Sequence, residues 1–233
     1  IALGTGMEHN KYTDAKYYVT GIVKRTYSNN VVIVDEKGNE VDGDKMMYIL
    51  AHRLKSCGML KDDTVVATIM SNSGFFKSLE NEGIKCEQTN VGDRFVYECM
   101  QEKGYDLGGE QSGHVIFLDE NTTGDGLLSA LHLLEVMVDT KKPLSELAKI
   151  MNVLPQALVN AKVPNHKKES YMEYPEIAKA IDELTKMFDG EGRVLIRPSG
   201  TEPLVRVMIE GKNQEQIEIE ARKLANLIQD VML

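Results

Sequence analysis

The middle of the chain alternates short apolar segments with longer amphipathic ones. Three of the short segments predict strands: TVVATIM (64–70), IKCEQTN (84–90) and HVIFL (114–118). Helices are predicted between them, over FFKSLENEG and near Arg94–Lys103, and Gly83 and Gly104 mark their ends. Strand–helix–strand–helix–strand order favours parallel strands joined by right-handed crossovers. We therefore expect residues 49–150 to form a three-layer α/β unit with a mostly parallel sheet.

A long helix is predicted to begin after Asp125, whose side chain suits the N-cap position. Its apolar residues recur at helical spacing and form a face of the kind that packs on a core: Leu127, Leu131, Leu134 and Val138. A further helix, PLSELAKIM, opens with Pro143 in its first turn.

The pattern changes near residue 152. Strands are predicted over three segments: VLPQALVNAKVPN, RVLIR (193–197) and LVRVMIEG (204–211). Helices are predicted over Tyr174–Phe188 and over the last part of the chain, whose buried stripe would be Ile217, Ala221, Leu224, Ile228 and Val231. Hairpin-plus-helix order predicts a small α+β domain with an antiparallel sheet and helices on one face. We place the domain boundary between Ile150 and Val153.

Within the last predicted strand, two sets of side chains alternate. Val205, Val207 and Ile209 are expected on one face, and Arg206, Met208 and Glu210 on the other. Residues 1–48 form a further region, in which KYYVTGIVKR and VVIVDEKGNEV predict strands with a turn at Glu36–Gly38.

Composition and charge narrow the classes of function. The 233 residues are 42% hydrophobic and 27% charged, which is typical of a soluble globular protein. The formal net charge of -9 disfavours nucleic acid and anionic membranes as partners, and an anionic substrate would need a local basic site. No apolar run approaches the roughly 20 residues of a membrane span, and no signal-peptide pattern is present. Three cysteines without a CxxC motif favour reduced thiols and a cytoplasmic location over a disulfide frame or a zinc site.

The segment RPSGTEPLVR (197–206) carries the strongest chemical signal. Arg197 and Arg206 bracket a loop in which Ser199 and Thr201 supply hydroxyl donors and Gly200 lets backbone N–H groups approach closely. Planar guanidinium groups, hydroxyls and an exposed backbone are what a phosphate requires. The alternative, on composition alone, is a surface hairpin with two solvated arginines.

Three further segments are candidates for binding polar ligands. GGEQSGH (108–114) places Glu110, Ser112 and His114 in a glycine-rich loop, where they suit sugar hydroxyls or a substrate ammonium; alternatively it is only a turn. VGDR (91–94) puts Asp93 and Arg94 at the start of a helix. They would bind a ligand at the carboxyl edge of the parallel sheet, or they are only a helix cap and a solvated charge. TTGDG (122–126) is explained most simply as the helix cap at Asp125.

Together these motifs resemble those of a known family. GGEQSGH, VGDR, TTGDG and RPSGTEPLVRVM, in this spacing, resemble the α-D-phosphohexomutases over roughly residues 31–233. The EQSGH and VGDR forms resemble the phosphoglucosamine mutase branch in particular. The resemblance implies four domains around one cleft. It also implies a phosphoserine that exchanges its phosphoryl group with the substrate, and an Mg²⁺ ion that balances the negative charge during transfer. The reaction implied converts glucosamine 6-phosphate to the 1-phosphate through a bisphosphate, which also serves as activator.

The resemblance also assigns roles by position. The sugar-binding domain would be residues 49–151, with Glu110, Ser112, His114, Asp93 and Arg94 as substrate-binding residues. The phosphate-binding domain would be residues 152–233, with Arg197, Ser199, Gly200, Thr201 and Arg206 holding the phosphate that does not react. Residues 1–48 would be unmatched strands followed by a remnant of the metal-bearing domain.

The chain departs from the family pattern in its first part. No serine stands in the family's nucleophile motif, and the place of the metal loop is taken by RTYSNN (25–30), without the three carboxylates that suit Mg²⁺. Asp42 and Asp44 follow the hairpin and are expected to be turn residues. Residues 1–30 do not resemble the family and are similar instead to the opening hairpin of an oligonucleotide/oligosaccharide-type barrel. We therefore expect neither a catalytic residue nor a metal ligand in this chain.

Three functions fit these observations. The chain is the substrate-binding half of a phosphohexomutase, inactive alone and active only with its missing domains; its partner would be a second copy of the chain or the missing N-terminal half. It is a module that binds phosphosugar without turnover, or it is a folded remnant that binds nothing. A truncation, a fusion boundary and a diverged paralogue each account for the unmatched start.

Overall fold

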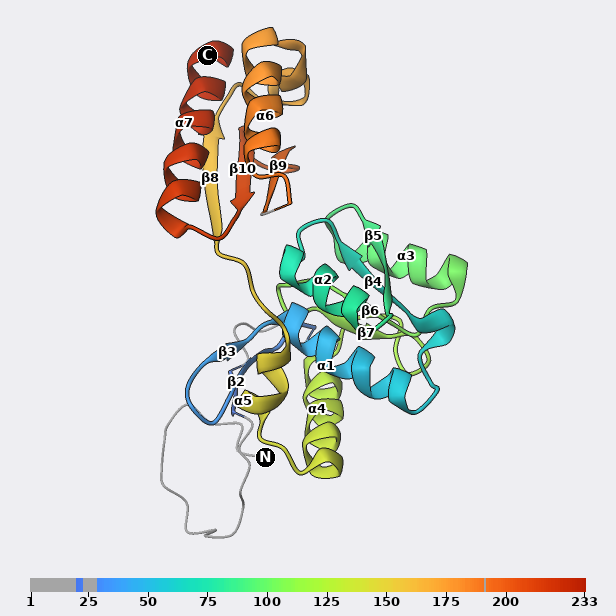
Figure 1. The fold of residues 1–233 in the computed structure, drawn as a ribbon. Coiled ribbons are helices and arrows are strands. Elements are labelled where there is room, and N and C mark those ends of the chain that lie inside the picture. The colour runs from blue at the N-terminus through green and yellow to red at the C-terminus, as the bar shows by residue number, and fades with distance from the viewer. Residues whose placement is uncertain (1–19, 23–28, 191) are drawn as a thin grey trace. The chain divides into compact units, whose positions relative to one another are not determined.

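The computed structural model describes residues 20–22, 29–190 and 192–233. The chain divides between Asn152 and Val153 into two units, called here the N-terminal and the C-terminal unit (Figure 1). Among the described residues, no helix has the length and apolar character needed to cross a membrane.

The described residues of the N-terminal unit form seven strands and five α-helices. Its strands are β1 (Thr20–Ile22), β2 (Val32–Val34), β3 (Glu40–Val41), β4 (Thr64–Thr68), β5 (Lys85–Thr89), β6 (Leu107–Gly109) and β7 (Val115–Phe117). Its helices are α1 (Gly43–Ser56), α2 (Ser73–Asn81), α3 (Asp93–Lys103), α4 (Gly126–Thr140) and α5 (Leu144–Leu147), with 3-10 helices at Lys61–Asp63 and Ala148–Ile150.

The main sheet of this unit has the strand order β5-β4-β6-β7. Strand β4 is parallel to both β5 and β6, as the alternating pattern predicts. All five residues of β4 are buried, which fits its β-branched sequence TVVAT. Helices α1, α2 and α4 pack on one face of the sheet, and α3 packs on the other through Val96 and Met100 (Figure 1). The expected three-layer arrangement is confirmed.

The prediction for the third parallel strand was wrong. That strand is β6, with the sequence LGG, and HVIFL instead supplies β7, which runs antiparallel to β6. Two glycines carry no strand signal, so the sequence did not reveal β6. The backbone here lies too close to its neighbours for a side chain, because a Cβ on Gly109 would lie 2.3 Å from the carbonyl oxygen of His114. The connection to β7 is also too short for the crossover that a parallel strand needs.

Helix α1 corrects a second expectation. Asp42 and Asp44 were expected in a turn, but Asp42 caps α1 by accepting from the backbone N–H of Lys45 (3.0 Å), and Asp44 lies fully buried within it. The carboxylate of Asp44 accepts from the backbone N–H of Asn72 (2.7 Å), which fixes the loop between β4 and α2. Carboxylates near a helix start satisfy backbone donors that the helix leaves open.

Helix α4 buries a different face from the predicted one. Asp125 does cap it, accepting from the N–H groups of Leu127 (2.9 Å) and Leu128 (3.1 Å). However, Leu127, Leu131 and Val138 are 54%, 44% and 68% exposed. The buried face is formed by Gly126, Ser129, Leu133, Val136 and Met137. The sequence GLLSALHLLEVMVDT is apolar on more than one side, so periodicity alone does not decide which stripe faces the core.

The C-terminal unit is a sheet covered on one face. Its strands are β8 (Gln156–Lys162), β9 (Arg193–Pro198) and β10 (Leu204–Glu210), and its helices are α6 (Pro175–Met187) and α7 (Gln214–Met232), with a 3-10 helix at Lys168–Glu173. The sheet is antiparallel with the order β8-β10-β9. Helices α6 and α7 lie side by side on it (Figure 1). The predicted small α+β architecture is confirmed.

The core of the C-terminal unit follows the predicted alternation. Val205, Val207 and Ile209 are fully buried against the helices. The buried stripe of α7 is that predicted from the sequence, except that Ala225 and Met232 join it and Val231 is only partly buried. On the opposite face of β10, Glu210 is buried beside Arg193 of β9, with Oε2 and Nε 2.8 Å apart.

The two faces of α4 provide a stability test. Leu133→Ala removes a fully buried side chain and should lower the free energy of unfolding by about 2–5 kcal/mol. Leu131→Ala, the matched control on the exposed face, should lower it by less than about 1 kcal/mol. Urea unfolding followed by circular dichroism measures both. Equal losses would contradict the observed orientation of the helix.

Candidate functional site

The ladder between β9 and β10 brings two arginines together. Arg197 is the direct cross-strand partner of Arg206, so their side chains leave the same face of the sheet. Directly opposite Cβ atoms in an antiparallel pair lie about 5 Å apart, and like charges in such positions repel. The Nε of Arg206 is buried and has no hydrogen-bond acceptor within the described part of the chain. This arrangement favours an anion beside the two guanidinium groups.

The loop that joins these strands, Ser199–Pro203, is called here the phosphate loop. Ser199 is 2% exposed; its N–H donates to the carbonyl of Leu204 (2.9 Å), and its Oγ accepts from the N–H of Glu202 (3.2 Å). Gly200 and Thr201 are exposed at the tip, and a Cβ on Gly200 would meet no atom within 4 Å. The loop is therefore held at its base and open at its tip, with room for a ligand beside the backbone.

Two further side chains hold the phosphate loop, and sequence reasoning missed both. The carboxylate of Glu202 accepts from Nη2 of Arg206 (2.9 Å), which orients that guanidinium group. The ammonium of Lys168 donates to the carbonyl oxygen of Ser199. No sequence signal marked Lys168, because it stands in the polar run HKKES far from the loop.

In the N-terminal unit, the loop Gly108–His114 is called here the sugar loop. It packs on segments far from it in sequence, with hydrogen bonds from Gly43 N–H to the carbonyl of Gln111 (2.9 Å) and from Val31 N–H to that of Gly113 (3.1 Å). Gly113 has φ +92°, and a Cβ there would lie 2.0 Å from the carbonyl oxygen of Val31. Only glycine fits this position, so the loop is built by close contact between backbones.

Glu110 connects the sugar loop to the VGDR segment. Its Oε1 accepts from the backbone N–H of Gly92 (3.0 Å). Asp93 follows as the first residue of α3, and Arg94 projects from that helix, where its side chain is 80% exposed and pairs with Glu98 (2.7 Å). The hydrogen bond that Arg94 donates to the Glu98 carboxylate raises the pKa of Arg94, which stays charged.

His114 is the point where several loops meet. It is 4% exposed, and its Nδ1 lies 3.1 Å from Oδ1 of Asn30 while its Nε2 accepts from the N–H of Gly124 (3.2 Å). An accepting Nε2 requires the tautomer with hydrogen on Nδ1. Asp93 lies 4.0 Å from Nε2. His114 thus joins the sugar loop to the VGDR and TTGDG segments and to the residues before β2.

Ser112 stands exposed at the tip of the sugar loop. Its Oγ is 3.5 Å from Nδ2 of Asn30. Asn29, the residue before, places Nδ2 3.5 Å from Oγ1 of Thr123. Both asparagines belong to the segment that occupies the place of the family's metal loop, and residues 25–28 of that segment lie outside the described residues. Sequence reasoning did not anticipate the contacts of Asn29 and Asn30, because more than 80 residues separate the partners.

Among the described residues, no three His, Cys, Asp or Glu side chains gather as a metal site would require. The three cysteines are free. Burial raises the pKa of Cys86 to about 12, so its thiol is not a nucleophile near neutral pH.

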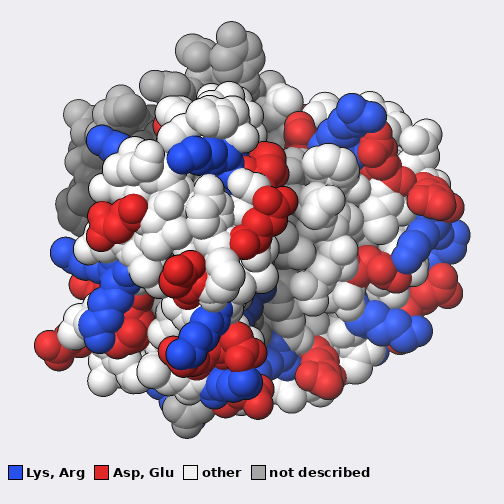
Figure 2. Space-filling view, turned by 90° about the horizontal axis from the view of Figure 1, so that it is seen from above, with Lys and Arg blue, Asp and Glu red and all other residues white. Residues whose placement is uncertain are grey.

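The face of the molecule seen in Figure 2 carries both signs of charge. Lysine and arginine side chains are interspersed with aspartate and glutamate over the face seen in Figure 2. With a net charge of -9 and no broad basic patch on that face, an anion has to be captured by short-range donors.

Comparison with known proteins follows the division into two units. Residues 42–154 match the model of the phosphoglucomutase/phosphomannomutase α/β/α domain III, and residues 158–227 match that of the C-terminal domain of the same family. Phosphoglucosamine mutase from Ruminiclostridium cellulolyticum is 56% identical over 202 residues, which cover 87% of this chain and 45% of the relative. The Bacillus subtilis phosphoglucosamine mutase is 54% identical over 204 residues, covering 88% and 45%.

The fold is also that of a solved enzyme. The crystal structure of Aspergillus fumigatus N-acetylphosphoglucosamine mutase in complex with GlcNAc-6P and magnesium superposes with a TM-score of 0.71 at 21% identity, covering 88% of this chain and 48% of that one. The chain spans about half the length of the relatives that it matches. With matched models over both units, the chain belongs to the phosphoglucomutase/phosphomannomutase family, that of the α-D-phosphohexomutases, and contains the family's domain III and C-terminal domain.

Proposed function

We propose that this chain supplies the substrate-binding part of a phosphoglucosamine mutase. The reaction would interconvert glucosamine 6-phosphate and glucosamine 1-phosphate by phosphoryl transfer, with glucosamine 1,6-bisphosphate as intermediate and activator. The identity of more than half of the aligned residues with phosphoglucosamine mutases supports the reaction class. The observation that carries the binding role is the pair Arg197 and Arg206, which are held opposite each other at the base of an open loop.

In this proposal the C-terminal unit binds the phosphate that does not react. Arg197 and Arg206 donate to its oxygens, and the hydroxyl of Ser199, which accepts from Glu202, still has its own hydrogen to donate. The hydroxyl of Thr201 and the N–H of Gly200 complete the donor set at the loop tip. A phosphate held by such fixed donors anchors one end of the sugar and so orients the other end for transfer.

The N-terminal unit would recognise the sugar. Glu110 has one carboxylate oxygen engaged with Gly92, and its other oxygen is proposed to accept from ring substituents, including the ammonium of glucosamine. Ser112 is exposed at the loop tip and would contact the ring. His114, Asp93 and Arg94 complete the proposed site. The ring of His114 holds the surrounding loops in position through its contacts with Asn30 and Gly124.

Magnesium is present in the Aspergillus fumigatus complex, and Mg²⁺ favours carboxylate and other oxygen ligands. The residues described here do not fit such a site, because no three suitable side chains gather among them. No step of phosphoryl transfer is therefore assigned to this chain, whose own residues bind and orient.

The first prediction concerns phosphate affinity. Arg197→Ala and Arg206→Ala should each weaken binding of inorganic phosphate and of glucosamine 6-phosphate by about tenfold or more, because each removes a charge-assisted hydrogen bond worth about 1.5–3 kcal/mol. Arg→Lys should restore affinity only in part, since an ammonium lacks the planar fork. Isothermal titration calorimetry measures the dissociation constants.

Arg222→Ala is the matched control for those variants. Arg222 carries the same charge but lies on α7, where it is 71% exposed and pairs with Glu218. Its removal should leave both dissociation constants unchanged. Unchanged affinity in folded Arg197→Ala and Arg206→Ala proteins would rule out the phosphate loop as the binding site.

The second prediction separates sugar recognition from phosphate recognition. Glu110→Gln keeps an oxygen that can accept from Gly92 but removes the charge that would attract the substrate ammonium. It should weaken binding of glucosamine 6-phosphate several-fold and leave inorganic phosphate unaffected. Glu102→Gln, at an exposed position near the end of α3, is the control for loss of one carboxylate. If Glu110→Gln reduces both affinities equally, Glu110 does not recognise the sugar.

A further inference from the structure

We propose that Lys168 is a positioning residue for the phosphate loop, holding its backbone in the anion-binding conformation and placing a buried positive charge beneath it. The proposal rests on the proposed function for its ligand and on the structure for its geometry. Lys168 lies outside the residues identified above as direct phosphate donors.

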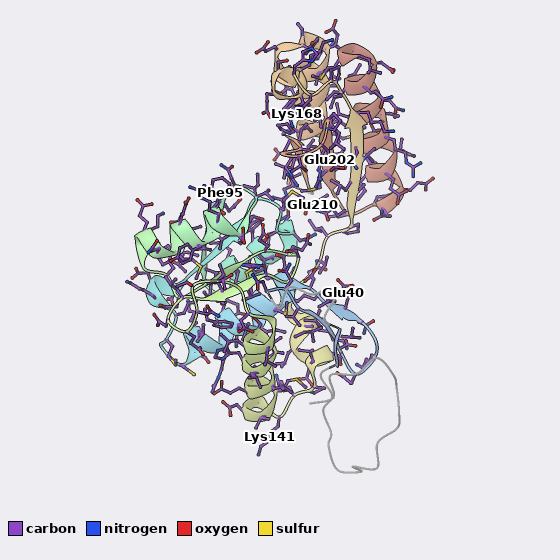
Figure 3. The ribbon with its side chains drawn as sticks, turned by 180° about the vertical axis from the view of Figure 1, so that it is seen from behind. Glu40, Phe95, Lys141, Lys168, Glu202 and Glu210 are labelled. Carbon is purple, nitrogen blue, oxygen red and sulfur yellow. The ribbon has the colours of Figure 1, made fainter. Side chains whose placement is uncertain are left out.

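The contacts of Lys168 are directed at both ends of the loop. Lys168 begins the 3-10 helix Lys168–Glu173 and is 7% exposed. Its Nζ donates to the carbonyl oxygen of Ser199 and lies 3.5 Å from that of Glu202. These carbonyls flank the tip residues Gly200 and Thr201, and both Lys168 and Glu202 are labelled in the C-terminal unit in Figure 3. One side chain therefore fastens both sides of the tip.

Peptide geometry links this anchoring to anion binding. In a trans peptide unit the C=O and the following N–H point in opposite directions. The carbonyl of Ser199 points to Lys168, so the N–H of Gly200 in the same peptide unit points away from it. That N–H is the backbone donor expected to meet the phosphate. Releasing the carbonyl of Ser199 would free the peptide unit to rotate and would misdirect the donor.

The charge of Lys168 has a second effect. Within the described residues its hydrogen-bond acceptors are backbone carbonyls, and no carboxylate lies within ion-pair distance of its ammonium. A buried charge without a counter-ion is costly, and carbonyl dipoles compensate it only in part. A phosphate bound in the loop would supply the missing negative charge. Lys168 should therefore favour the doubly charged form of the phosphate over the singly charged form.

The neighbouring residue provides a matched control. Lys167 is also a lysine whose Nζ donates to a backbone carbonyl, that of Met232 (2.9 Å), at the end of α7 and not in the phosphate loop. Lys167→Met and Lys168→Met thus remove the same charge, with one backbone hydrogen bond lost in the first variant and two in the second. Only the second affects the phosphate loop.

The test compares these two variants with the unaltered chain. Titration calorimetry gives their affinities for inorganic phosphate and glucosamine 6-phosphate, and ³¹P NMR gives the second pKa of the bound phosphate, which is about 6 for a free phosphate ester. Lys168→Met should weaken both ligands about tenfold and move the pKa of the bound phosphate upward toward its free value. Lys167→Met should change neither. A lysine that merely ties the 3-10 helix to the hairpin would not move the pKa of the bound phosphate.

Two additional measurements test the role of Lys168 if Lys168→Met does not fold or if the unaltered chain does not bind the ligands. If Lys168→Met does not fold, Lys168→Gln keeps N–H donors without the charge, and it should still raise the pKa of the bound phosphate. If the unaltered chain binds neither ligand, the proposed function fails. Amide hydrogen exchange at Ser199 and Glu202, whose N–H groups are hydrogen-bonded at the base of the loop, then tests Lys168 alone, with faster exchange expected in Lys168→Met but not in Lys167→Met. Unchanged affinity and bound-phosphate pKa, or unchanged exchange at Ser199 and Glu202, would overturn the proposal.

Discussion

Two guanidinium groups held opposite each other across the β9–β10 ladder are the constraint on which the phosphate binding proposed for the C-terminal unit depends. Arg197 and Arg206 repel each other, yet the register that pairs them is fixed by the other face of the sheet. Val205, Val207 and Ile209 are fully buried there, and a slip of one residue would expose all of them. The hydrophobic core thus fixes Arg197 and Arg206 opposite each other, and in the proposed site one bound anion would accept from both.

The N-terminal unit achieves precision by a different means. Its sugar loop lies against Val31 and Gly43 more closely than side chains would allow, and glycines occupy the points of contact. At Gly124 a Cβ would lie 2.7 Å from Cε1 of His114, so the ring of His114 fits only against a glycine. The hydrogen bonds of that ring then bring loops from distant parts of the sequence into a single arrangement. The C-terminal unit positions two charged side chains by the pairing of β9 with β10, and the N-terminal unit positions its loops by close backbone contacts.

Local signals in the sequence predicted much of this structure. The cap at Asp125, the glycine end of α3 at Gly104 and the alternation of β10 were all recognisable, because each depends on neighbours in sequence. Strand β6 was missed because its two glycines carry no side-chain pattern. The buried face of α4 was misassigned because that helix is apolar on more than one side. These errors mark positions where packing, and not local preference, selects the structure.

The candidate site shows the same limit. The motifs identified the loops that would bind the ligand, since their residue types suit phosphate and sugar. The supporting contacts were invisible, because Asn30 meets His114 and Lys168 meets Ser199 only after the chain has folded. Lys168 is one lysine in a polar run, and only its burial and its contacts in the folded chain distinguish it from Lys167 beside it. Residues suited by type to a ligand are therefore easier to pick out from sequence than the distant residues that contact them in the fold.

The central claim is that phosphate binds between Arg197 and Arg206 at the phosphate loop. The most direct measurement follows the guanidinium Nε–H and backbone amide signals of the ¹⁵N-labelled chain during titration with glucosamine 6-phosphate. The account predicts saturable shifts for the Nε–H signals of Arg197 and Arg206 and the amides of Gly200 and Thr201, with Arg222 unchanged. Saturable shifts confined to other residues, or no shifts at millimolar ligand, would contradict it.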